Sequence, residues 1–177
     1  MTPDGTALPR ALAGTGAALA VVSVPLSYLR VGGTPATLPL PAAGAVDADA
    51  LVAVAVLAGA AVGLVDHTRG EQLLGTVAGG LAAAVAVAWA AGVDLTAGPG
   101  LAVAMVAWGF LEAADLFGPR LSHPRTPRSR PLVAVAVCVA GTVGFLLLAG
   151  WVRLPVGVLA VAAWLYAVRW ELTASRG

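Results

Sequence analysis

The chain has 177 residues, of which 59% are hydrophobic and 11% charged, and its formal net charge is +1. Because an ordinary soluble domain carries about 25% charged residues, this composition excludes an ordinary soluble domain. Lysine is absent, which excludes a P-loop lysine and Schiff-base chemistry, and the single Cys138 excludes an intrachain disulfide and a multi-cysteine metal site.

Isoleucine and asparagine are also absent, and all ten cationic residues are arginine. The codons of lysine, isoleucine and asparagine are rich in A and T, so their absence indicates a prokaryote with a GC-rich genome. Such a genome raises the share of Ala, Val, Gly and Arg, and short motifs built from these residues then arise often by chance. The lack of asparagine leaves no acceptor for N-glycosylation.

Six long apolar stretches follow one another along the chain. About 20 helical residues cross the hydrocarbon layer of a bilayer, and backbone groups in lipid must bond within their own segment, which favours helices. The sequence therefore predicts an all-α integral membrane protein, a single polytopic domain over residues 1–177 with about six transmembrane helices. The predicted helices cover residues 11–29, 48–65, 73–93, 99–118, 132–152 and 154–170.

Prolines mark the end of the first stretch and the segment after it. Pro25 is expected to kink the first helix, with the neighbouring serine hydroxyls bonding the freed carbonyls. Residues 30–47, RVGGTPATLPLPAAGAVD, contain three prolines and three glycines, which argue against a helix. We expect an external loop with extended turns, and a re-entrant segment is the alternative. Asp47 or Asp49 is expected to cap the next helix.

Residues 63–72, GLVDHTRGEQ, join the second and third predicted helices. Asp66, His67 and Arg69, with Glu71 nearby, form a candidate cytoplasmic cluster. A catalytic or metal-binding loop is one interpretation. One histidine and two carboxylates are few ligands for a metal, however, and their order matches no known metal motif. We therefore favour a short charged turn and expect no metal.

Two pairs of glycines flank this turn at G-x-x-x-G spacing. Gly59 and Gly63 lie in the second predicted helix, and Gly75 and Gly79 lie in the third. Small residues at matching depth allow two helix backbones to approach closely in a membrane. The pairs predict close packing of these two helices, with no catalytic role.

Two carboxylates interrupt the fourth stretch near its end. The wholly apolar part, residues 101–111, covers only about 16 Å at 1.5 Å per residue, which is too short to cross the hydrocarbon layer. Glu112 is therefore expected inside the membrane, about 9 Å from the helix end, with Asp115 about half as deep. Spacing of three residues places both on one face, with Trp108 one turn before Glu112.

These carboxylates occupy C-terminal helical turns, where the helix dipole disfavours negative charge. The favoured interpretation is an acid–arginine cluster that anchors the helix, with Arg69, Arg120 or Arg125 as the positive partner. The alternative is that Glu112 binds a proton or a cation on a transport path, because acids inside a membrane are costly and often functional.

The segment 119–131, PRLSHPRTPRSRP, interleaves arginine with proline and contains no acid. An extended, solvated loop is expected. Its arginines can bind anionic lipid headgroups, each contributing about 1 kcal/mol near such a surface. Nucleic-acid binding is not expected, because the segment has no interleaved aromatic residues and no folded module. The basic loop residues are Arg120, Arg125, Arg128 and Arg130.

The arginines also predict the orientation of the chain. If six helices cross, one side holds eight arginines and the other only Arg30 and Arg153, which places both termini in the cytoplasm. The expected location is the cell membrane. The eight arginines are Arg10, Arg69, Arg120, Arg125, Arg128, Arg130, Arg169 and Arg176.

No motif names an activity. The leading hypothesis is a small non-enzymatic membrane protein, either a minor transporter or channel-like protein or a subunit of a membrane complex, in contact with lipid and with a membrane-protein partner or a second copy. One alternative is a membrane-embedded lipid-modifying enzyme that uses Glu112, Asp115, Asp66 and His67 at the cytoplasmic interface. Another is a structural or assembly partner. No cofactor is expected.

Overall fold

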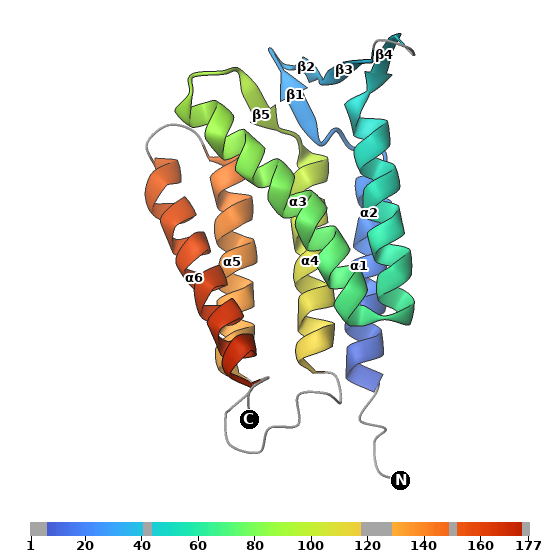
Figure 1. Ribbon diagram of the computed structural model, residues 1–177, viewed down its shortest axis with the longest axis vertical. Coiled ribbons are helices and arrows are strands. Elements are labelled where there is room, and N and C mark those ends of the chain that lie inside the picture. Colours follow the sequence, from blue (N-terminus) through green and yellow to red (C-terminus); the bar gives the residue numbers. More distant parts are fainter. Residues whose placement is uncertain (1–6, 41–43, 118–128, 149–151, 175–177) are drawn as a thin grey trace.

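The computed structural model describes residues 7–40, 44–117, 129–148 and 152–174. In this part of the chain six helices form a bundle, and short strands cover one end of it (Figure 1). The expected helical class is confirmed. The helices are α1 (Ala7–Ser23), α2 (Ala48–Val65), α3 (His67–Ala90), α4 (Pro99–Leu116), α5 (Ser129–Leu147) and α6 (Arg153–Ala174).

Prolines and aspartates set the helix starts. Pro99 is the first residue of α4, and Pro9, Pro131 and Pro155 each lie third in their helices. Proline is tolerated there because the first-turn N–H groups have no partner within the helix. Helix α5 therefore begins three residues earlier than the sequence predicts, so that residues 129–131 of the basic segment are helical. At α2, the side chain of Asp47 accepts a hydrogen bond from the Asp49 N–H, as expected of a cap.

Helix α1 ends before Pro25 and does not continue through it with a kink. Its last residue is Ser23, whereas the predicted span extended to residue 29. A residue before proline avoids the helical conformation, which makes Val24 a natural stop. The Ser23 hydroxyl donates to the Ala20 carbonyl at 2.7 Å and satisfies one of the carbonyls left at the helix end.

A single residue, Asp66, connects α2 to α3. Its N–H bonds the Val62 carbonyl at the end of α2, and its carboxylate accepts from the Arg69 N–H at the start of α3. Because Asp66 ends one helix and caps the next, the expected charged turn of residues 66–72 is reduced to this residue. His67, Arg69 and Glu71 lie in the first turns of α3.

Five short strands occupy the end of the bundle opposite the α2–α3 connection (Figure 1). They form an antiparallel sheet in the order β2–β1–β5 and an antiparallel hairpin of β3 with β4. We call these two sheets the β-cap. Residues 30–31, 34–35, 37–40 and 44–47 thus lie in paired strands where a loop was expected. The strands are β1 (Leu29–Val31), β2 (Thr34–Pro35), β3 (Thr37–Leu40), β4 (Gly44–Asp47) and β5 (Leu95–Ala97).

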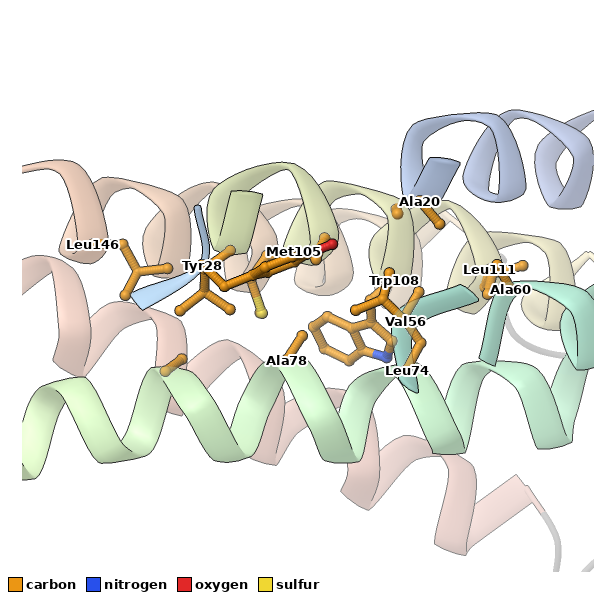
Figure 2. Close-up of a cluster of buried hydrophobic side chains, with 14 of the residues drawn as sticks. Ala20, Tyr28, Val56, Ala60, Leu74, Ala78, Met105, Trp108, Leu111 and Leu146 are labelled. Atoms are coloured by element: carbon orange, nitrogen blue, oxygen red, sulfur yellow. The ribbon is translucent and has the colours of Figure 1, made fainter. Parts of the chain in front are cut away.

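Helix α4 lies at the centre of the bundle. It packs against α1, α3 and α5, while α6 packs mainly on α5 at the edge of the molecule (Figure 1). Helix α3 crosses α4 diagonally, from α2 at one end to α5 at the other, where Trp89 meets Phe145 edge-on at 6.3 Å between ring centroids. Figure 2 shows the resulting core, in which Trp108 and Met105 of α4 face Leu74 and Ala78 of α3.

Three helices are long and apolar enough to cross a membrane, namely α2, α3 and α4. The other three contain shorter apolar stretches among the described residues, at Ala7–Ser23, Val133–Leu147 and Arg153–Tyr166. Large apolar side chains are exposed on the outer surfaces of α2 and α6, including Val54, Leu64, Val158 and Leu165. An exposed apolar surface of this extent suits a lipid environment.

Candidate functional site

Glu112 is buried in the central helix. Its side chain is only 7% exposed, and it lies in the last turns of α4, four residues before Leu116 ends the helix. Ionised carboxylates are almost never buried without a partner. Glu112 does have an interaction partner, and no buried side-chain nitrogen or oxygen in the described residues lacks a hydrogen bond.

Asp115, one turn after Glu112, is hydrogen-bonded to α3. The Thr68 hydroxyl donates to Asp115 Oδ1 at 2.7 Å. Thr68 lies in the first turn of α3 and Asp115 in the last turn of α4, so this bond joins the two antiparallel helices at the end of the bundle away from the β-cap. Sequence reasoning did not identify Thr68.

A second hydrogen bond joins the same helices one turn further into the bundle. The Trp108 indole N–H donates to Glu71 Oε1 at 3.1 Å. Gly75 gives the indole its space, because a Cβ on Gly75 would lie 2.7 Å from Trp108 Nε1. Thr68, Glu71 and Gly75 follow one another at spacings of three and four residues, so they share the face of α3 that meets α4.

Glu112 lies between α3 and α5. Successive residues of a helix are rotated by about 100° around its axis. Glu112 is therefore rotated by about 40° from Trp108, which faces α3, and by about 60° from Gly109, which faces α5. Gly109 packs against Val139 of α5. Cys138, the residue before Val139 on α5, is buried. Glu112 therefore lies on the side of α4 that is between its contacts with α3 and α5.

Arg69, one of the expected positive partners, instead pairs with Asp66. The Arg69 Nε atom lies 3.5 Å from Asp66 Oδ2, and its side chain is 78% exposed. An exposed pair of this kind contributes little to stability. Arg120, Arg125 and Arg128 lie outside the described residues, and of Arg130 only the helical backbone is described.

The candidate cluster of Asp66, His67 and Arg69 is used in joining α2 to α3. His67 Nδ1 lies 2.7 Å from the Gly63 carbonyl oxygen, and because a carbonyl only accepts, Nδ1 carries the proton. Among the described residues no three His, Cys, Asp or Glu side chains are grouped so that they could hold a metal ion.

Gly59 and Gly63 lie at the contact of α2 with α3, whereas Gly75 lies at the contact of α3 with α4. Gly59 packs against Leu74 of α3, and Gly63 meets both Gly70 of α3 and Leu111 of α4. The close approach of α3 to α2 occurs at Gly70, where an added Cβ would lie 2.1 Å from the Gly63 Cα. Gly75 faces Trp108 of α4, whereas a Cβ added to Gly79 would have no other atom within 4 Å.

A second polar cluster, absent from the sequence analysis, lies beneath the β-cap. Asp49 Oδ1 accepts from the Tyr28 and Leu29 N–H groups at 2.8 and 3.2 Å. The Tyr28 side chain is fully buried, and its hydroxyl lies 2.8 Å from Ser23 Oγ. Since the Ser23 hydroxyl donates to Ala20, Tyr28 is the donor to Ser23.

The surroundings of Tyr28, which lies outside the helices, change its acidity. Burial raises the pKa of Tyr28 above its ordinary value, and the nearby charge of Asp49 raises it further, while the hydrogen bond with Ser23 lowers it. Tyr28 is thus a neutral hydroxyl whose role is to hold the β-cap to α1. Its partners are 5 and 21 residues away in the sequence, which hides the cluster from local pattern reading.

Comparison with protein-family models, with curated proteins and with solved structures gives no match for this chain.

Proposed function

We propose that the chain is a multi-pass protein of the cell membrane with six spans and both termini in the cytoplasm. Its support is the arrangement of the helices, because successive helices alternate in direction along the chain, and α1 begins at the end where α6 finishes (Figure 1). The three helices that are long enough to cross a membrane lie among the others in one bundle.

The arginines support the same orientation. The starts of α1, α3 and α5 carry Arg10, Arg69 and Arg130, and these helix ends lie together. Arg30 of β1 and Arg153 at the start of α6 lie at the β-cap end. Positive residues remain on the cytoplasmic side during insertion, so the β-cap is the external end.

Within this bundle, the protein acts as a small transporter or channel-like protein in which Glu112 binds a proton or a cation. The observation that carries this proposal is the burial of Glu112 on the central helix. A carboxyl group in such a place must either carry a proton or be matched by a positive charge. Exchange between these two states is the chemistry that a transported proton or cation supplies.

Reconstituted vesicles test this role. The purified full chain is placed in liposomes with a pH-sensitive and a Na⁺-sensitive dye inside, and a potassium diffusion potential is applied. Movement of protons or sodium ions is expected for the unmodified protein and for Asp94→Asn, which changes an exposed carboxyl group of the external end. Glu112→Gln should abolish it, whereas flux retained by Glu112→Gln, or no response from the unmodified protein, contradicts the proposal.

A membrane-complex subunit or assembly partner is the second candidate, and the position of α6 favours it. Helix α6 packs mainly on α5 and exposes Val158, Val161 and Leu165. In this case Glu112→Gln leaves function intact, whereas Val161→Trp changes the mass of the complex measured by native mass spectrometry. An unchanged complex with Val161→Trp contradicts this candidate.

The basic segment 119–131 adds a lipid partner to the proposal. In the proposed orientation its arginines are cytoplasmic, and anionic headgroups on that side would attract them. We expect the purified protein to retain phosphatidylglycerol or cardiolipin, and Arg125→Gln with Arg128→Gln to lower the retained amount measured by lipid mass spectrometry. Equal retention by the double variant contradicts this part.

A further inference from the structure

We infer that Glu71 is a positioning residue that regulates access to the Glu112 site, because its bond to Trp108 holds α3 closed against α4. This inference rests on the proposed role of Glu112, and it concerns a residue that does not itself bind the transported ion. We call the hydrogen bond between Trp108 Nε1 and Glu71 Oε1 the α3–α4 latch.

The latch lies beside Glu112. Trp108 precedes Glu112 by one turn of α4, and Asp115 follows it by about one turn. Both neighbours are hydrogen-bonded to α3, through Glu71 at 3.1 Å and Thr68 at 2.7 Å. Glu112 is thus placed on a stretch of α4 that α3 fastens at both ends.

Steric fit makes the latch specific to this helix pair. The indole reaches Glu71 only because position 75 has no side chain, since a Cβ there would lie 2.7 Å from Nε1. Glu71 is half-buried, and its Oε1 accepts the indole N–H. Opening the latch therefore hydrates Glu71 at small cost and separates α3 from the α4 face next to Glu112.

Helix α3 is also held by contacts outside its interface with α4. At its start, Asp66 and the Gly63–Gly70 approach hold it to α2. At its far end, Trp89 contacts Phe145 of α5. Side-chain hydrogen bonds of Glu71 and Thr68 join α3 to α4. Loss of the Glu71 bond thus loosens α3 from α4 near the start of α3, one turn of α4 before Glu112.

Cys138 reports on this opening without any transport assay. It is the only cysteine of the chain, it is buried on α5, and it precedes Val139, which packs against Gly109 of α4. Its alkylation by N-ethylmaleimide in detergent micelles, at one fixed pH, measures how often the space around Glu112 becomes accessible. The full chain is used throughout, and thermal unfolding of each variant confirms that it is folded at the labelling temperature.

Glu71→Ala should speed alkylation about 3- to 10-fold, the change expected when one net hydrogen bond is lost. Trp108→Phe should do the same, and the double variant should be no faster than either alone, because both remove one bond. Glu71→Gln keeps an acceptor oxygen and should label at the unmodified rate, as should Gln72→Ala on the exposed side of α3.

Unchanged labelling of Glu71→Ala, or additive effects in the double variant, overturns the latch. These outcomes are separate from those of the transport test. If the unmodified protein moves no ion while Glu71→Ala still speeds the alkylation of Cys138, the latch stands and the proposed transport role fails. If ions move but labelling is unaffected by Glu71, transport stands and the latch fails.

Discussion

At the scale of single residues, the two glycines of the predicted third-helix pair have different surroundings. Gly75 has Trp108 Nε1 at 2.7 Å from the place of an added Cβ, whereas Gly79 has nothing within 4 Å. Gly75→Ala should therefore destabilise the protein by about 1–3 kcal/mol through overpacking. Gly79→Ala is the matched control and should be neutral or slightly stabilising, because alanine favours helix.

The measurement is thermal unfolding in one detergent, followed by circular dichroism. A Gly75→Ala melting temperature equal to that of Gly79→Ala would show that Trp108 can move aside freely, and the contact between α3 and α4 would then need another explanation. Glycine spacing alone treats both positions alike. Only the location of Trp108 on the neighbouring helix distinguishes them.

Tyr28 gives a prediction about alkaline pH. Burial raises its pKa, so between its ordinary value and its folded value the folded protein keeps a proton that the unfolded chain loses. The protonated Tyr28 hydroxyl contributes fully to the free energy of unfolding below a pH of about 10. This contribution is lost as the pH rises further. Tyr28→Phe should remove this alkaline loss, as measured by unfolding at pH 8 to 11.

The chain has two tyrosines, so phenolate absorbance provides a second measurement. In the folded protein the rise in absorbance as Tyr28 ionises should occur at a higher pH than in the unfolded chain. This rise should be missing in Tyr28→Phe. A rise at the same pH in folded and unfolded protein would contradict the burial of the hydroxyl.

At the scale of elements, Asp49 joins the β-cap to α2. One of its oxygens accepts two N–H groups from Tyr28 and Leu29. Asp49→Ala leaves both donors without this acceptor, and we expect a loss of about 1–3 kcal/mol. Asp49→Asn retains an acceptor oxygen and should lose less. The check is the rate of proteolysis within residues 29–36, with Asp94→Asn as control; equal rates in all variants would contradict the role.

The elements that could be predicted from the sequence are those with local signals at their ends. The stretch 48–65 coincides with α2 because Asp47 and Asp66 cap both of its ends. The β-cap could not be predicted, because its strands have two to four residues and β1 pairs with β5, 64 residues away. Strands this short have no readable alternation, and the pairing is set by the helices that bring the segments together.

In the candidate site too, features within one helix could be predicted and contacts between helices could not. The placement of Glu112 within α4 and the shared face of Asp115 and Trp108 follow from helical spacing within one segment. Thr68 and Glu71 belong to another helix, and their pairing depends on where α3 crosses α4. The spacing of Thr68, Glu71 and Gly75 along one helical face is the available signal in the sequence, but the charged residues 66–72 also fit a turn.

At the scale of the whole molecule, the orientation can be tested on exposed positions. Thr34 lies at the β-cap and is exposed, while Arg69 lies at the other end with its side chain 78% exposed. In a Cys138→Ala background, Thr34→Cys should react in intact cells with a membrane-impermeant maleimide. Arg69→Cys should react only after the cells are opened. Labelling of both from outside would contradict the proposed topology.

The pairing of β1 with β5 also sets an order of assembly during synthesis. Strand β1 emerges long before β5, and α1 packs chiefly against α4, which follows β5. At about 5–20 residues per second, the ribosome takes on the order of ten seconds to supply the missing strand. In the proposed membrane topology, the first three helices therefore wait in lipid until α4 supplies the main packing partner of α1. A nascent chain stalled before residue 95 is the form most exposed to membrane proteases.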